Sequence, residues 1–345
     1  MNNNAISYFG LTTSQSQILF SLERMLVIND IPATAVKKKV IINYEKRAKV
    51  KKQWLALWEK SINDYLTHLD NSNSRLLMTH SEIVQSILEE NKKTETEIWK
   101  YLILLECCFL AAYTPLGGTQ EEIEESGKLF AGLKLDKESR KKTLLEIAAL
   151  LDIDSKYVEV FEKSKKAAFK RLSNYWFKVA VSAGVGLLIA IILLIPGVRE
   201  IAVAVAPQGL HGAAAVQAGL AALGGGAIAE GGLGTAGGFA VVVGGGALLG
   251  IGAGGSVGLL IASNNSKAIL GESVKLEVVL REIVLAIQND TLQFQQILNK
   301  LSAEKEALKL ELERLKKAQK ENQKKIKELK KSIDYLERLI KDLRK

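Results

Sequence analysis

The sequence predicts an all-α protein that consists of a helical bundle, two transmembrane helices with a Gly/Ala-rich region between them, and a C-terminal coiled coil. Three observations support this architecture. Runs of Leu, Ala, Glu and Lys dominate, aromatic residues make up only 6% of the 345 residues, and strand-like alternation is scarce. Of the 28 glycines, 22 lie between Val179 and Ser266. The C-terminal tail repeats Leu and Ile at heptad spacing.

Residues 1–170 are expected to form a cytosolic bundle of amphipathic helices that serves as a sensor or regulatory domain. The stretch "TQEE" at Thr119–Glu122 matches a capping box, and Gly132 suits the end of the helix that this box would start. Leu144, Ile147 and Leu151 are spaced to share one face of the next helix. The remaining helices are predicted at Ser16–Leu26, Lys49–Leu69, Ser81–Glu90 and Thr96–Tyr113.

Residues 171–266 are expected to be the transmembrane region, with a first span at residues 179–198. No charge interrupts this stretch, and at about 1.5 Å per residue it matches the roughly 30 Å of a bilayer's hydrocarbon core. Basic residues between Lys165 and Lys178 precede the span, whereas only Arg199 follows it closely, so the positive-inside rule keeps the N-terminal domain in the cytoplasm. A buried helix of a soluble protein is the alternative.

The second span is predicted at residues 239–263. A flexible linker would carry Ser, Lys or Glu among its glycines, but here the neighbours are Ala, Val, Leu and Ile. The "GIGAGG" at Gly250–Gly255 matches a dinucleotide-binding pattern, yet no strand–helix–strand unit surrounds it. A glycine occurs at every fourth position, and on a helix these glycines would form a smooth strip against which another helix can pack closely. The residues of this strip are Gly246, Gly250, Gly254 and Gly258.

Residues 201–238 lie between the two predicted spans and are expected to form a re-entrant or interfacial piece. An apolar hairpin and a third span are the alternatives, but a third span would place the basic C-terminus on the far side of the membrane. Glu230 is an ionisable residue within this region, and ionisable groups at membrane depth are functional candidates by default. Equally, Glu230 would sit in water if it lies in a turn.

Residues 267–345 are expected to be a coiled-coil oligomerisation domain, since Leu or Ile occupies eleven of the fourteen a and d positions between Leu298 and Leu343. Gln319 and Asn322 form a polar layer that would fix the register. Ile at a with Leu at d favours a parallel pair of helices, and a tetramer could hold two such pairs. A lone charged helix or an intramolecular hairpin also accounts for the pattern. The positions nominated for oligomerisation are Leu315, Asn322, Ile326, Leu329, Ile333, Leu336, Ile340 and Leu343.

No pattern of catalytic residues is present, so we expect neither an enzyme nor a bound cofactor or metal. The three histidines, His68, His80 and His211, form no metal-ligand pair, and no nucleophile elbow or phosphate-binding loop occurs. Cys107 and Cys108 are adjacent on a predicted helix and cannot easily bridge each other. They are expected to be buried small apolar side chains in a reduced compartment.

A basic cluster with interleaved aromatic residues is the candidate ligand site. Cations that track phosphates beside rings that stack on bases would suit a short single-stranded oligonucleotide or a cyclic nucleotide. A solvated helix face and a surface that contacts anionic lipid are the two alternatives. The nominated residues are Lys37, Lys38, Lys39, Lys46, Arg47, Lys49, Lys51, Lys52 and Trp54.

The order of parts and the stretch "HGAAAVQAGLAALGGGAIAEGGLGTAGG" at His211–Gly238 resemble membrane effectors of bacterial antiphage systems, most of all the Hailong type. That resemblance implies a homotetrameric channel in the bacterial inner membrane, which single-stranded DNA oligomers made by a partner nucleotidyltransferase hold shut. Two spans place both termini in the cytoplasm. It implies no ligand residues position by position. The expected function is therefore a gated ion-conducting pore that depolarises the cell in antiphage defence. A membrane-anchored coiled-coil scaffold is the alternative.

Overall fold

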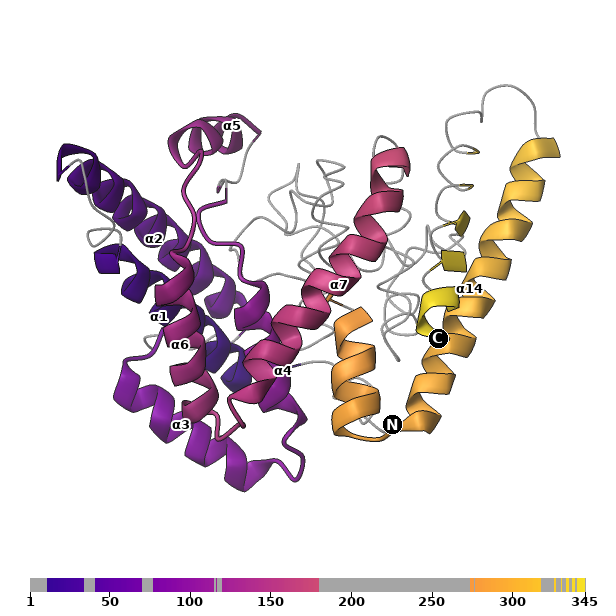
Figure 1. Ribbon diagram of the computed structural model, residues 1–345, viewed down its shortest axis with the longest axis horizontal. Helices are drawn as coiled ribbons and strands as arrows, with labels where there is room; N and C mark the ends of the chain where they lie inside the picture. The colour runs from indigo at the N-terminus through magenta and orange to yellow at the C-terminus, as the bar shows by residue number, and fades with distance from the viewer. Residues whose placement is uncertain are drawn as a thin grey trace. The chain divides into compact units, whose positions relative to one another are not determined.

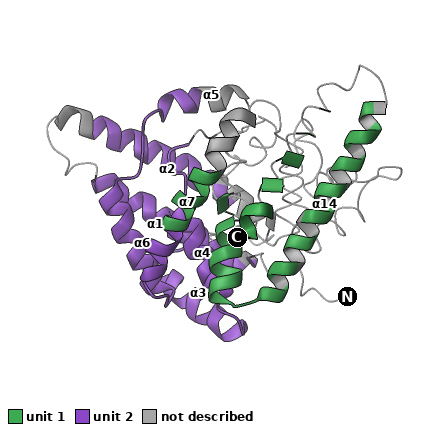
Figure 2. Ribbon diagram, turned by 45° about the vertical axis from the view of Figure 1, so that its right-hand side comes forward, with its two compact units in different colours: residues 1–6, 163–242, 260–345 green, residues 7–162, 243–259 purple. Residues whose placement is uncertain are grey.

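The computed structural model is all-helical in the residues it describes, with no strand among them, which confirms the predicted all-α class for that part of the chain (Figure 1). The described residues are 11–33, 41–69, 77–114, 116, 120–179, 274–275, 277–317 and several positions between 326 and 344. They fall into two compact units, coloured separately in Figure 2. Helix α7 (Lys156–Val179) continues through residue 170, where the sequence suggested a boundary, and the division between the units falls after Glu162.

In its described residues, the first unit is a bundle of six helices and the first turns of α7, built around α1. The helices are α1 (Thr13–Ala33), α2 (Ile41–Leu69), α3 (His80–Lys93), α4 (Ile98–Phe109), α5 (Gln120–Leu129) and α6 (Lys137–Leu150). Helix α1 contacts α2, α3, α4 and α6. Its apolar side chains, among them Ile18, Phe20 and Leu26, are buried on several faces, which is the pattern of a central helix.

Local sequence signals set the ends of two of these helices. Thr79 accepts a hydrogen bond from the backbone N–H of Glu82, and the Glu82 carboxylate accepts one in return from the N–H of Thr79, so α3 starts with a complete capping box. Asp136 caps α6 by accepting from the N–H groups of Glu138 and Ser139. The capping box expected at Thr119–Glu122 begins outside the described residues, although α5 does begin at Gln120.

The core of this unit confirms two predictions from the sequence. Leu144, Ile147 and Leu151 are buried together on the inner side of α6 and the turn after it. Cys107 and Cys108 are free thiols with no exposed surface on α4. Burial is the largest cause that raises the pKa of the Cys107 thiol well above its usual value, so this cysteine behaves as a small apolar group.

The second unit contains the rest of α7, η4 (Val279–Ile287), α14 (Thr291–Lys317) and the described tail residues. Helix η4 is a π-helix, and the N–H of Gln288 bonds to the carbonyl of Ile283 five residues earlier. Its residues Val279, Leu280, Ile283 and Val284 are buried and form part of the core of this unit. Helix η4 packs against α14.

No helix among the described residues is both long enough and apolar enough to cross a membrane. The predicted span at 239–263 and the Gly/Ala-rich region at 201–238 lie outside the described residues, as does the span at 179–198 apart from Val179. The strip glycines Gly246, Gly250, Gly254 and Gly258 and the carboxylate Glu230 therefore lie outside the description as well.

Candidate functional site

The nominated basic cluster divides into an exposed part and a buried part. The exposed part consists of four residues of α2, whose charged groups are accessible to a ligand: Lys46, Arg47, Lys49 and Lys52. Lys37, Lys38 and Lys39 lie outside the described residues. Lys51 and Trp54, by contrast, are buried in the bundle, and this corrects their nomination as ligand-contacting residues. The cause is helical periodicity, which places these two side chains on the buried face of α2.

Trp54 is fixed inside the bundle by its neighbours. Its indole N–H donates to the carbonyl of Thr114 at 2.7 Å. Its ring stacks on that of Trp58, with 6.0 Å between centroids, and meets the ring of Tyr113 edge-on at 5.3 Å. Because the indole has no exposed surface, it is not available to stack on a base.

Lys51 belongs to a buried polar network centred on Asp30. One carboxylate oxygen of Asp30, Oδ2, accepts from the ammonium of Lys51 and from the hydroxyl of Tyr113, each at 2.5 Å. The other, Oδ1, accepts from the backbone N–H of Asp136 at 2.5 Å. Lys51 also donates to the carbonyl of Lys134 at 3.2 Å. Burial and the hydrogen bond to Asp30 raise the pKa of Tyr113, so its phenol stays a donor.

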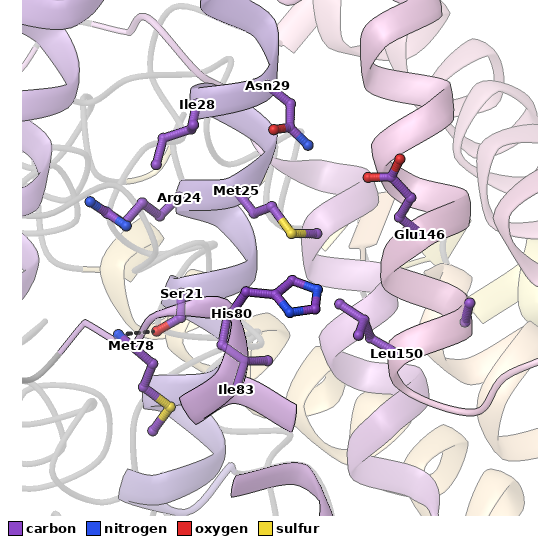
Figure 3. Close-up of a pocket in the computed structure, with 11 residues that line it drawn as sticks. Ser21, Arg24, Met25, Ile28, Asn29, Met78, His80, Ile83, Glu146 and Leu150 are labelled. Carbon is purple, nitrogen blue, oxygen red and sulfur yellow. Dashed lines mark hydrogen bonds between the residues drawn. The ribbon is translucent and has the colours of Figure 1, made fainter. Parts of the chain in front are cut away.

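An apolar groove of about 610 Å³ lies between α1, α3 and α6 of the first unit (Figure 3). Met25 and Ile28 of α1, Ile83 of α3 and Leu150 of α6 supply apolar walls. Figure 3 shows His80 extending toward Leu150 and Glu146 lying opposite α1. A second hollow of about 710 Å³ shares Asn29 and Glu146 with this groove and continues it toward the start of α6.

The predicted membrane segments lie between residues 179 and 263, which are called the apolar region below. In the second unit, side chains from the two flanks of this region contact each other. Arg171, on the last turns of α7, and Arg281, on η4, both donate to the same carboxylate oxygen, Oε1 of Glu277. The distance between Nε of Arg281 and Oε1 of Glu277 is 3.0 Å. Glu277 has no exposed surface, and its second oxygen, Oε2, has no hydrogen-bond partner among the described residues.

A second contact joins the same two flanks. The hydroxyl of Ser164 on α7 donates to the carboxylate of Glu282 on η4. Arg281 in addition donates to the backbone carbonyl of Asp342, near the end of the chain. The cluster Arg171–Glu277–Arg281, called the base cluster below, therefore joins the helix before residue 180, the helix after residue 273, and the C-terminal tail.

The described tail residues pack within one chain. Leu298 and Leu312 on α14 are buried, as are Ile333, Ile340 and Leu343 further along, and the ammonium of Lys309 lies 2.9 Å from the carboxylate of Glu337. This is the arrangement of the intramolecular hairpin that the sequence left open as an alternative. Ile326 is half-buried, the side chain of Leu315 is not described, and Asn322, Leu329 and Leu336 lie outside the described residues. Assembly into a tetramer or dimer stays a prediction.

Sequence reasoning missed both charged networks. Asp30 stands in the apolar stretch "LVINDI", and an acid in such a stretch on a predicted helix is a signal for a buried partner. Glu277 and Arg281 stand four residues apart in "LEVVLREIV", which is the spacing of an ion pair on one helix turn. Nothing in the sequence indicates that Arg171, more than a hundred residues earlier, completes the cluster.

The described residues contain no group of three or more His, Cys, Asp or Glu side chains arranged to hold a metal ion. In comparisons with known proteins, no family model, no curated protein and no solved structure matches the chain.

Proposed function

We propose that the chain is an oligomeric membrane effector whose apolar region, residues 179–263, forms a gated ion-conducting path that depolarises the bacterial inner membrane. The observation that carries the proposal is the base cluster. It joins Arg171, before this region, to Glu277, after it. Both ends of the apolar region are therefore attached to the same folded unit. A flexible linker between domains would not require its two ends to be bonded to each other.

The base cluster also constrains the path of the chain between Arg171 and Glu277. Two flanks that are bonded to each other lie on the same side of any bilayer that the intervening segment enters. The segment therefore crosses an even number of times. Two spans with a re-entrant piece between them satisfy this condition, whereas three spans do not. The bias of Lys and Arg toward the N-terminal flank places that side in the cytoplasm.

The cytosolic helical unit is the sensor in this proposal. Exposed Lys46, Arg47, Lys49 and Lys52 line the first half of α2 and present positive charge to phosphates. The ligand class is a short single-stranded oligonucleotide or a cyclic nucleotide, the product of a partner nucleotidyltransferase. A ligand gates the path only if its affinity differs between the closed and conducting states.

Expression without a controlling partner tests the proposal. We expect expression to be toxic and to lower the membrane potential. We also expect the protein to be found in the membrane fraction and to be extracted from it only by detergent. Gly250→Leu and Gly254→Leu are expected to abolish toxicity, because a leucine side chain blocks close approach at the glycine strip. Gly271→Leu, outside the predicted span, is the matched control.

Three results separate this proposal from its rivals. Unchanged membrane potential in cells that contain the protein would refute the conducting role. Membrane residence without conductance in liposomes would indicate a membrane-anchored scaffold. Extraction without detergent would refute the membrane proposal altogether.

A further inference from the structure

We propose that the base cluster is a latch that ties the C-terminal tail to the two flanks of the apolar region, so that release of the tail changes conduction. The proposal rests on the proposed function, because the latch affects conduction only if the apolar region, residues 179–263, forms the conducting path. It goes beyond that function by naming the element that couples the tail to the path.

The geometry places three parts of the chain at one carboxylate. Arg171 belongs to the flank before the apolar region, Glu277 to the flank after it, and Arg281 reaches both Glu277 and the Asp342 carbonyl of the tail. Each guanidinium has several donors in a fixed planar fork, which lets Arg281 hold two acceptors at once. Movement of the tail therefore acts directly on the residue that stabilises Glu277.

The electrostatics make this contact act as a switch. A buried carboxylate is costly unless cations and hydrogen bonds compensate it. Among the described residues both guanidinium contacts of Glu277 are made to one of its oxygens, and the other oxygen has no partner. Among the described residues, loss of Arg281 would leave the exposed Arg171 as the one ion-pair partner of this buried carboxylate. The favourable response is for Glu277 to reach water, which requires the flanks to move apart.

The helix that carries Arg281 is suited to such a change. The π-helix is rare, and single turns of it occur often at functional sites. Helix η4 is π-helical from Val279 to Ile287 and is anchored to α7 by the contact between Glu282 and Ser164. A return to α-helical hydrogen bonding would shift the position of Arg281 relative to Glu277. Helix η4 therefore provides a segment that can change register as the latch opens.

The test uses the full chain and the variants Glu277→Gln and Arg281→Gln. Trypsin cleavage of the tail in detergent measures release of the tail, and ion flux into liposomes measures conduction. We expect tail cleavage to accelerate about tenfold or more in both variants, and flux to differ from the wild type by about threefold or more in the same variants. Glu306→Gln, which removes an exposed carboxylate paired with Lys305 and Lys309, is the matched control and should change neither quantity.

Labelling of Cys107 and Cys108 reports whether the first unit stays folded, since both thiols are buried there. Faster tail cleavage together with altered flux, with these thiols protected, supports the latch. Unchanged cleavage overturns it, and faster cleavage with wild-type flux shows a structural tie that does not regulate conduction. Absence of flux in the wild type refutes the proposed function instead, while the proteolysis still decides whether the latch exists.

Discussion

Replacing Asp30 with alanine should increase the population of the open form of the first unit far more than any substitution at the surface of that unit. Asp30 has no exposed surface, and its partner Lys51 is 4% exposed, so the substitution leaves a buried ammonium without its carboxylate. Removing one partner of a buried ion pair costs about 3–5 kcal/mol. Tyr113 and the N–H of Asp136 lose an acceptor as well. We therefore expect an effect toward the upper end of that range.

Thiol labelling measures this cost without unfolding the whole chain. Cys107 and Cys108 are the only cysteines of the sequence, and both are buried in this unit. When opening is fast relative to labelling, the labelling rate follows the population of the open form. A loss of about 3–5 kcal/mol corresponds to a rate increase of about 2.2 to 3.7 orders of magnitude, at about 1.36 kcal/mol for each factor of ten.

Two further variants make the test specific to the buried charge. Glu146→Gln removes an exposed carboxylate that lies 3.9 Å from Lys142, a pair expected to contribute at most about 0.5 kcal/mol. The double variant Asp30→Ala/Lys51→Met removes both buried charges and should recover part of the loss. A labelling rate for Asp30→Ala within about threefold of the wild type would refute the conclusion that Asp30 is buried and compensated as described.

Three other substitutions test local features of the first unit. Thr79→Ala removes the capping box of α3 and should lower the free energy of unfolding by about 1 kcal/mol in chemical denaturation. Gly132 has a φ of 75°, so Gly132→Ala should cost about 1 kcal/mol, which a lower melting temperature would reveal. The pKa of Tyr113 is raised in the folded state, so its phenol stabilises the fold fully below about pH 10 and loses this contribution above it, where the unfolded chain releases the proton first. Tyr113→Phe should remove that loss in circular-dichroism melts between about pH 9 and 11.

The sequence predicted helices best where one apolar face repeats clearly. The face of Leu144, Ile147 and Leu151 is buried as expected. Helix ends were predicted less well. Helix α2 begins at Ile41 and not at Lys49, because a run of lysines shows no apolar period. Helix α1 continues to Ala33 through Pro32, a residue at which sequence rules end a helix.

The placement of Lys51 was predictable from the sequence in principle. Ala48, Lys51, Trp54, Trp58 and Ile62 are separated by three or four residues and are all buried on one face of α2. Charge alone grouped Lys51 with its exposed neighbours, whereas periodicity groups it with the tryptophans. The base cluster was not predictable in this way, because no local pattern joins Arg171 to Glu277. Such a pairing is a property of the tertiary fold.

The heptad pattern of the tail establishes an apolar face but does not determine which helix covers it, and crosslinking can decide. A zero-length carbodiimide crosslink between Lys309 and Glu337 is expected, because their charged atoms lie 2.9 Å apart. In a parallel oligomer of straight helices the same residues would be about 42 Å apart along the axis and would not react. In a mixture of isotopically light and heavy chains, the hairpin predicts crosslinked peptides that carry one label only. Mixed labels would show instead that the tails pair between copies in antiparallel fashion, which would join the latch of one subunit to the tail of another.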